Sequence, residues 1–356
     1  MTGNGGVKSS AMLRKVSPLF RLTAIVVIAG LAFAFAPARA QSVEEFYSNH
    51  VLELYIGFSA GGGYDAYGRL IARHIGRHIP GNPTVVVVNM DGAGSLKLAN
   101  WLYNAAPKDG SVIGTVNRGV PFEPLIGIRE MALFDATKFT WLGSANDEVS
   151  VCVAWERTGI KSFDELYERD LIVASTGQAG DDPVVKMIAG VLGVRIKLIS
   201  GYAGANEANF AMERGEVDGR CSWSWSSIVS TRRNWLDNGD IEVLLQLGFR
   251  KHADLPDVPL ILDLAKTEED RQIMRLVLVR GVLGRPFMAP PDIPEERALA
   301  LQAAFNATVV DPEFLAEAKR LRMEVVPISG EEIRNLVIEA YATPVSVVEK
   351  TREMLR

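Results

Sequence analysis

The chain has 356 residues, a formal net charge of −5, two cysteines and 48% hydrophobic residues. An acidic chain lacks the basic surface that nucleic acids and anionic membranes require, so these partners are excluded. The length is sufficient for two domains of ordinary size, and two cysteines are too few for a zinc ribbon.

The N-terminus has the three parts of an export signal. Its positively charged segment contains Lys8, Arg14, Lys15 and Arg21. Residues 22–35 are an apolar run of about 14 residues, which is short for a membrane span of roughly 20. Ala38-Arg39-Ala40 has the small-x-small pattern of a cleavage site. We therefore predict a signal peptide over residues 1–40, cleaved after Ala40, and a periplasmic location; an uncleaved anchor is the less favoured alternative.

Export changes the charge and the redox environment of the chain. Residues 1–40 hold five basic and no acidic residues, so the charge of −5 becomes −10 after cleavage. An anionic ligand must then be held locally, by backbone N–H groups and a few side chains. Cys152 and Cys221 lie in apolar, strand-like stretches. They form either one disulfide or two free buried thiols.

A glycine-rich loop joins the first predicted strand to the first predicted helix. The strand covers residues 54–56, the loop 59–63 and the helix 65–79. One face of this helix is apolar (Tyr67, Leu70, Ile71, Ile75 and Ile79), and the opposite side carries Arg69, Arg73 and Arg77. The free N–H groups at a helix start suit an anion, and glycine lets a ligand approach them. The loop is either a ligand site or only a tight turn.

Strands and helices alternate along the rest of the chain. We predict strands at 85–89, 111–116, 149–155, 171–174, 195–199, 217–225 and 241–247. We predict helices at 96–104, 182–192, 268–279, 295–308, 312–321 and 331–350. Another helix begins at the capping box of Ser162, and one more follows the loop 201–205 and ends at Arg214. Such alternation predicts parallel sheets covered by helices, with ligands at the carboxyl ends of the strands.

Five short motifs occur together in a fixed order. They are FSAGGGYD at 58–65, DGAG at 91–94, APKDG at 106–110, GEVD at 215–218 and LPDVP at 255–259. In this order they resemble the substrate-binding proteins of tripartite tricarboxylate transporters, the TctC or Bug family. The resemblance covers essentially the whole chain after residue 40. The family usually has a basic residue beside the second loop, where this chain has Asn89-Met90-Asp91, which leaves the ligand's identity open.

This resemblance implies an α/β, two-domain type II periplasmic-binding-protein fold with an interdomain cleft. Domain 1 would comprise residues 41–147 plus 249–356, and domain 2 residues 148–248. The implied function is capture of a small carboxylate for integral-membrane transporter subunits, by a monomer with no cofactor, metal or catalytic residue. A receptor for a signalling sensor would use the same cleft and stays an alternative. A secreted hydrolase or transferase is disfavoured because no nucleophile motif is recognisable.

The family's ligand loops map onto three segments of this chain. The expected ligand-binding residues are Phe58, Ser59, Ala60, Gly61, Gly62, Gly63, Tyr64 and Asp65, then Ser175, Thr176, Gly177 and Gly180, then Tyr202 and Gly204. The resemblance implies that these loops hold a carboxylate largely through backbone N–H groups, hydroxyls and bridging water.

Single residues add further candidates. Arg118 follows a predicted strand and either pairs with a second carboxylate or is a surface arginine. Arg220 is similar, with an ion pair inside its domain as the alternative. The run CSWSWS at 221–226 would place three hydroxyls on one strand face and two tryptophans on the other. Either the face with Ser222 or the face with Trp223 could line the cleft. The alternative is that the tryptophans only pack in the core.

Two further features have structural explanations. Asp65 lies in the first turn of its helix, where it either stabilises the helix start or meets an ammonium group of the ligand. His74 and His78 are spaced i, i+4 and could share a metal ion. We favour a solvated helix face for both histidines, because no acidic ligand is close in sequence.

Overall fold

A computed structural model describes residues 1–6, 41–127, 129–177 and 179–356. Met1–Ser42 and Val43–Arg356 form separate units. The charged segment, apolar run and cleavage site of the predicted signal peptide fall within residues 7–40, outside the described residues. In the part of the chain that is described, no helix is both long and apolar enough to cross a membrane.

The first sheet has six strands in the order β11-β4-β10-β3-β1-β2. The strands are β1 (Leu52–Ile56), β2 (Val85–Asn89), β3 (Val112–Thr115), β4 (Thr140–Ser144), β10 (Pro286–Ala289) and β11 (Ile328–Ser329). β1 is parallel to β2 and β3, whereas β10 is antiparallel to β3 and β4. The carboxyl ends of β1, β2 and β3 therefore meet at one edge, from which the first glycine-rich loop leaves.

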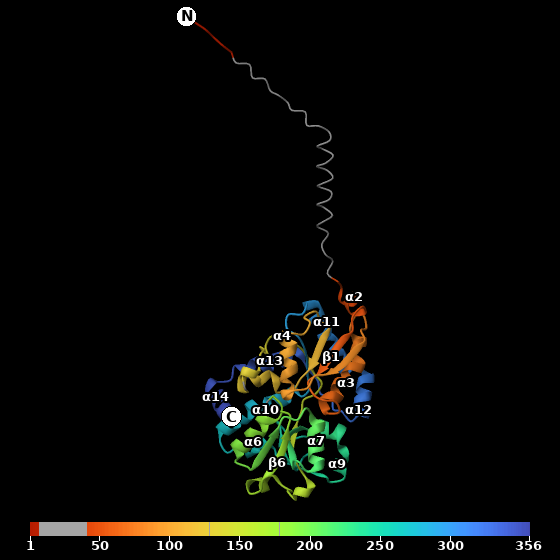
Figure 1. Cartoon of the computed structure of the whole chain (residues 1–356), viewed down its shortest axis with the longest axis vertical. Helices are drawn as coiled ribbons and strands as arrows, with labels where there is room; N and C mark the ends of the chain where they lie inside the picture. The colour runs from red at the N-terminus through yellow and green to blue at the C-terminus, as the bar shows by residue number, and fades with distance from the viewer. Residues whose placement is uncertain (7–40, 128, 178) are drawn as a thin grey trace. The chain divides into compact units, whose positions relative to one another are not determined.

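The second sheet has five strands in the order β7-β6-β8-β5-β9. They are β5 (Ser150–Trp155), β6 (Leu171–Ser175), β7 (Ile196–Ser200), β8 (Gly219–Ser224) and β9 (Ile241–Leu247). Figure 1 shows β6, α6, α7 and α9, in green, grouped apart from β1, α3 and α11. All strands between residues 150 and 247 belong to this sheet. The exact domain boundaries stay a prediction.

Helices cover both sheets. They are α2 (Val43–Ser48), α3 (Gly63–Ile75), α4 (Leu96–Asn104), α5 (Glu123–Ile126), α6 (Asp182–Leu192), α7 (Ala205–Arg214), α8 (Trp225–Thr231), α9 (Arg233–Asp237), α10 (Glu268–Leu278), α11 (Glu295–Val310), α12 (Pro312–Arg320), α13 (Gly330–Tyr341) and α14 (Val345–Leu355). The predicted apolar face of α3 is buried, with Tyr67, Leu70 and Ile71 fully inaccessible. Its arginines remain partly exposed, so the periodicity prediction is confirmed.

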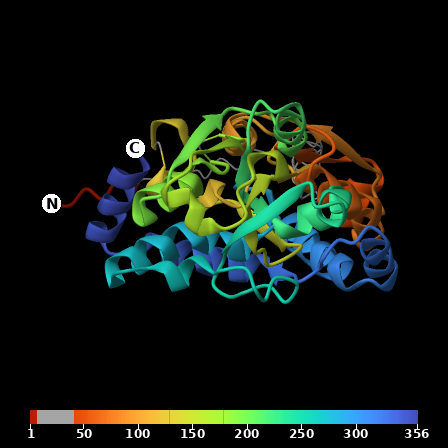
Figure 2. The same cartoon turned by 90° about the horizontal axis from the view of Figure 1, so that it is seen from below.

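The C-terminal prediction of one helix over 331–350 is wrong. The chain forms α13 and α14, separated by Ala342, Thr343 and Pro344. Proline has no N–H and disfavours helical geometry in the residue before it, so the first helix stops there. The break lets α14 pack beside α10 and α6, and Figure 2 shows α14, in dark blue, next to the teal α10.

The predicted strand over 217–225 ends earlier than expected. β8 stops at Ser224, and α8 begins at Trp225. Ser222 has a φ of +67°, and the pairing of β5 with β8 shifts between Val151 and Val153. A bulge of this kind re-aims side chains, so the predicted simple alternation of hydroxyl and tryptophan faces is wrong.

Other local predictions were incomplete. The strands β4, β10 and β11 were not recognised, because all three are short and β10 begins with a proline. The capping box at Ser162 is present but opens a 3₁₀ helix, Phe163–Tyr167. Cys152 on β5 and Cys221 on β8 are joined by a disulfide, which decides between the two alternatives left by the sequence.

Candidate functional site

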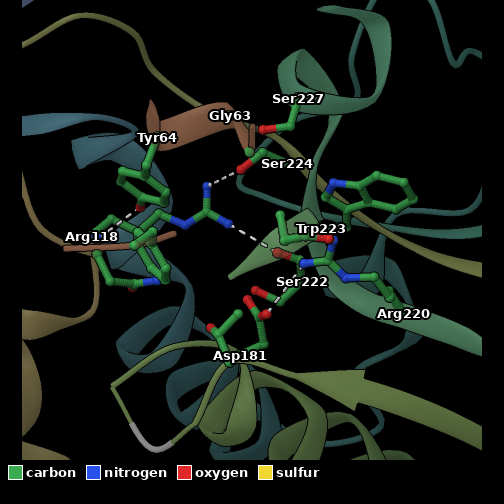
Figure 3. A pocket seen from close by; sticks show the side chains of 14 residues that line it. Gly63, Tyr64, Arg118, Asp181, Arg220, Ser222, Trp223, Ser224 and Ser227 are labelled. Atoms are coloured by element: carbon green, nitrogen blue, oxygen red, sulfur yellow. Dashed lines mark hydrogen bonds and ion pairs between the residues drawn. The ribbon is translucent and has the colours of Figure 1, made fainter. Parts of the chain in front are cut away.

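The helices α3, α6, α7 and α8 begin around one cavity. In none of these four helices does the N-cap side chain accept a hydrogen bond from an N–H group of the first turn. The cavity is lined by Phe58, Gly62, Gly63, Tyr64, Asn117, Arg118, Thr176, Asp181, Ala205, Arg220, Ser222, Trp223, Ser224 and Ser227 (Figure 3). Because each helix start carries a partial positive charge, the cavity favours an anion.

The cavity is narrow and lies where segments of the two sheets meet. Its volume is about 40 Å³. Beside it, Ser59 Oγ donates a hydrogen bond of 2.6 Å to Glu207 on α7. Gly62 lies so close to Ala205 that a Cβ on Gly62 would be 3.1 Å from the alanine methyl group. The glycine-rich loop thus packs directly on the start of α7.

Arg118 extends across the cavity from the segment after β3 to β5 and β8. Its guanidinium donates to Ser224 Oγ at 3.0 Å, to the Ser222 carbonyl at 3.2 Å and to Ser150 Oγ. The side chain is buried, with 4% of the residue exposed. Within the described part of the chain, no carboxylate forms an ion pair with it. Arg118 is therefore a buried cation held only by neutral acceptors, and Figure 3 shows it in the centre of the site.

Arg220 and Asp181 line the opposite side of the cavity. Arg220 donates to Asn209 Oδ1 at 2.9 Å, lies 4.6 Å from the Trp223 ring centre and leaves its Nε without a partner. Its Nη2 is 3.7 Å from the Asp181 carboxylate. Burial raises the pKa of Asp181, and the positive charge of Arg220 opposes this rise. The side chains of the lining thus carry two arginine charges and one carboxylate.

The structure brings together about half of the predicted site residues. Those that line the cavity are Phe58, Gly62, Gly63, Tyr64, Arg118, Thr176, Ser222 and Trp223. Those outside its lining are Ser59, Ala60, Gly61, Asp65, Ser175, Gly177, Gly180, Tyr202 and Gly204. The prediction did not include Asn117, Asp181, Ala205, Ser224 or Ser227, whereas Arg220, which the sequence offered as a candidate, lines the cavity and also forms the alternative ion pair, with Asp181. No ligand is present, so all of these assignments remain predictions.

Residues outside the lining support its loops. The Asp65 carboxylate accepts hydrogen bonds of 3.0 Å from Gly61 N, Arg69 Nε and Asn89 Nδ2. These bonds match the structural alternative for Asp65, which ties the glycine-rich loop to its helix. Ser175 Oγ donates to Asp182 and so holds the start of α6 against β6.

His74 on α3 and His78 in the 3₁₀ turn Gly76–His78 pair with two acidic residues, one on α12 and one just before it. His74 Nε2 is 2.5 Å from Glu317, and His78 Nε2 is 2.8 Å from Asp311. His74 is also buried, with 7% exposed. The expectation of a solvated face without acidic neighbours is therefore wrong for His74, because α12 covers it. The acidic partners are more than 200 residues away in sequence, where spacing could not indicate them.

No family model matches the chain, and a search of curated proteins found no match. Solved structures do resemble it. The periplasmic binding protein BugD shares 20% identity with a TM-score of 0.68, covering 86% of this chain and 98% of its own. MatC from Rhodopseudomonas palustris with bound malate shares 19% identity with a TM-score of 0.65, and the match covers 86% of this chain and 99% of MatC. R. palustris Rpa4515 with adipate shares 18% identity with a TM-score of 0.66, and the match covers 86% of this chain and 98% of Rpa4515.

The chain has the fold of a periplasmic binding protein. The two-domain α/β architecture expected from the sequence is thereby confirmed. In this periplasmic-binding-protein fold, the first glycine-rich loop, α6 and α7 all start at carboxyl ends of parallel strands. Ligands of open α/β sheets bind at such edges, so the fold and the cavity indicate the same place.

Proposed function

We propose that the chain is a periplasmic solute-binding protein for a tripartite tricarboxylate-type transporter. It captures a small organic acid in the cavity between the two sheets and delivers it to integral-membrane subunits. It acts as a monomer without a cofactor and performs no chemistry on the ligand. Residues 1–40 direct its export and are cleaved after Ala40.

One observation carries this proposal: Arg118 is a buried cation that forms no ion pair with any carboxylate of the described residues. A buried charge is costly unless it is paired, and here it lies among helix starts that also favour a negative charge. A ligand carboxylate would supply the missing charge. Hydroxyls of Ser224 and Ser227 add further hydrogen-bond donors.

Similar solved structures support the choice of ligand class. MatC was solved with malate and Rpa4515 with adipate, and both ligands are carboxylates. Both of those proteins share the fold over nearly their whole length, which makes a carboxylate the first ligand class to test.

The first experiment is native mass spectrometry of protein purified from its own host without denaturation. A bound mass that matches an organic acid supports the proposal and names the compound. Calorimetry with a panel of carboxylic acids then measures affinity, and the absence of binding to every acid by folded protein would contradict the proposal.

Replacement of Arg118 tests the charge partner. Truncating one partner of a buried charge pair costs about 2 to 5 kcal/mol, so R118Q should weaken binding at least about thirtyfold in calorimetry. The matched control is R214Q, because Arg214 is exposed and outside the cavity. Equal affinities of R118Q and R214Q would exclude Arg118 as the charge partner.

A further inference from the structure

Asp181 places a carboxylate in the cavity without a hydrogen-bond donor. The residue is buried, with 7% exposed, and Figure 3 shows its side chain directed into the site. It occupies the N-cap position of α6, yet its side chain makes no capping hydrogen bond. In the described residues its nearest cationic nitrogen is Arg220 Nη2 at 3.7 Å, beyond hydrogen-bonding distance. The carboxylate is therefore ion-paired with Arg220, has no donor within hydrogen-bonding distance among the described residues, and faces the ligand cavity.

Arg220 Nη2 is paired with Asp181, whereas other N–H groups of the surrounding arginines donate to other acceptors. Arg220 on β8, Arg118 after β3 and Arg280 before β10 all influence its carboxylate, as does Asp182 on α6. Arg220 donates to Asn209, and Arg280 donates to Asn117 Oδ1 at 2.9 Å and to the Ala179 carbonyl at 2.5 Å. Asp182 accepts from Ser175 and Ser200. These cations lower the cost of burying Asp181 but do not satisfy its oxygens.

A ligand can satisfy Asp181 only with a donor group. A ligand hydroxyl or ammonium group at this point gains a strong hydrogen bond to a charged acceptor. A second ligand carboxylate there would instead meet a like charge in a narrow, largely buried cavity. The two kinds of ligand should therefore differ clearly in affinity.

We propose that Asp181 is a specificity-determining residue of the ligand site. The ligand is an organic acid that also carries a hydroxyl or ammonium group facing Asp181, and acids with a second carboxylate at that point are rejected. The proposal rests on the proposed carboxylate-binding function and deepens it. Arg118 and the helix starts hold the ligand's anionic group, and Asp181 accepts a hydrogen bond from the ligand's hydroxyl or ammonium group.

Calorimetry with acids of matched size tests this proposal. The first series is 4-aminobutanoate, 4-hydroxybutanoate, pentanoate and glutarate, which changes only the group at the far end. The second is malate, aspartate and succinate, which adds or removes a donor at the second carbon. In at least one series the best donor-bearing acid should bind wild-type protein at least tenfold more tightly than pentanoate and glutarate, or than succinate.

The variant D181N should remove this preference. The amide keeps the size of the side chain, removes its charge and can itself donate, so dicarboxylates should gain affinity and the tenfold ratio should fall below about threefold. D237N is the matched control, since Asp237 is an exposed residue of α9 outside the cavity. It should keep the wild-type ratio.

The outcomes separate the two proposals. If donor-bearing and donor-free acids bind wild-type protein equally, or if folded D181N keeps the wild-type ratio, the role of Asp181 is overturned while carboxylate binding stands. If no acid binds folded wild-type protein or folded D181N, the proposed function itself fails and the role of Asp181 fails with it. The wild-type ratio needs no variant, so the test remains decisive even if D181N does not fold.

Discussion

Gly63 packs against α8 without room for a side chain. An added Cβ would lie 1.9 Å from Ser227 Oγ, 2.9 Å from Ser227 Cβ and 3.2 Å from Arg285 Nη2. Rotation of the hydroxyl removes only the first of these clashes. The position therefore requires glycine because of close packing between the loop and α8, independently of any ligand.

We expect G63A to destabilise the protein. Overpacking of this kind costs about 1 to 3 kcal/mol, measurable as a lower free energy of unfolding in urea. G63A should cost less in the S227G background than in wild-type protein, because both of the closest atoms belong to the Ser227 side chain. G248A is the control, since its Cβ would meet only ordinary contacts from 3.4 Å outward. Equal stabilities of G63A and G248A would contradict this account.

The sequence identified Arg118 but could not decide its environment. Its position after a strand indicated a place at the sheet edge, which the cavity lining confirms. Its burial depends on Ser222 and Ser224, more than 100 residues later, and no local pattern contains that contact. Asp181 was missed for a related reason: before a helix, an aspartate is first interpreted as a cap, and here it caps nothing.

At the scale of elements, hydrophobic periodicity was informative and local breaks were not. The ranges of β2, α4, α6 and β9 agree with the predicted ones, because each is a regular apolar pattern between clear turn signals. The end of β8 depends instead on a positive φ at Ser222, a residue type that gives little warning of one. The edge strand β11 has two residues and is too short to show a period.

The loop after β9 is tied to the segment after α12 by His252. Its Nε2 is 3.6 Å from Glu324, and its Nδ1 is 3.7 Å from Asp254. The ion pair with Glu324 raises the pKa of His252 above 6.5, and partial burial opposes this rise. The two segments are therefore held together more strongly when the imidazole is protonated.

This pKa shift makes stability depend on pH in a defined direction. Since the folded pKa is raised, the stabilisation is fully present below pH 6.5 and is lost as the pH rises through the folded pKa. We expect H252Q to flatten this part of the profile of unfolding free energy between about pH 5.5 and 8.5. E324Q should flatten it as well, because it removes the partner. An unchanged slope in both variants would show that another group is responsible.

At the scale of the whole molecule, the fold was predictable and the arrangement across the cavity was not. Motif order and alternating elements indicated two sheet-containing parts, and solved structures confirm that fold. The contacts that join the parts are single side chains, such as Ser59 with Glu207 and Arg285 with Ser227. Such pairs depend on how two surfaces meet, so no periodicity in either segment could predict them.

The disulfide links the stability of the second sheet to export. Cys152 and Cys221 are 69 residues apart, and the loop they close contains β6, α6, β7 and α7. Closing a loop of this length restricts the unfolded chain and stabilises the folded state by about 4 kcal/mol in the chain-entropy model. An exported protein meets the oxidising conditions in which such a bond persists.

We therefore expect the double variant C152A/C221A to unfold at lower urea concentration, with a loss of up to about 4 kcal/mol. Reduction of wild-type protein during unfolding should lower its stability similarly, whereas the double variant should not respond to reductant. Alkylation of protein from its own host under denaturing conditions, followed by mass spectrometry, should find no free thiol. Two alkylated cysteines would show that the bond does not form in the cell, and would also weaken the proposed periplasmic location.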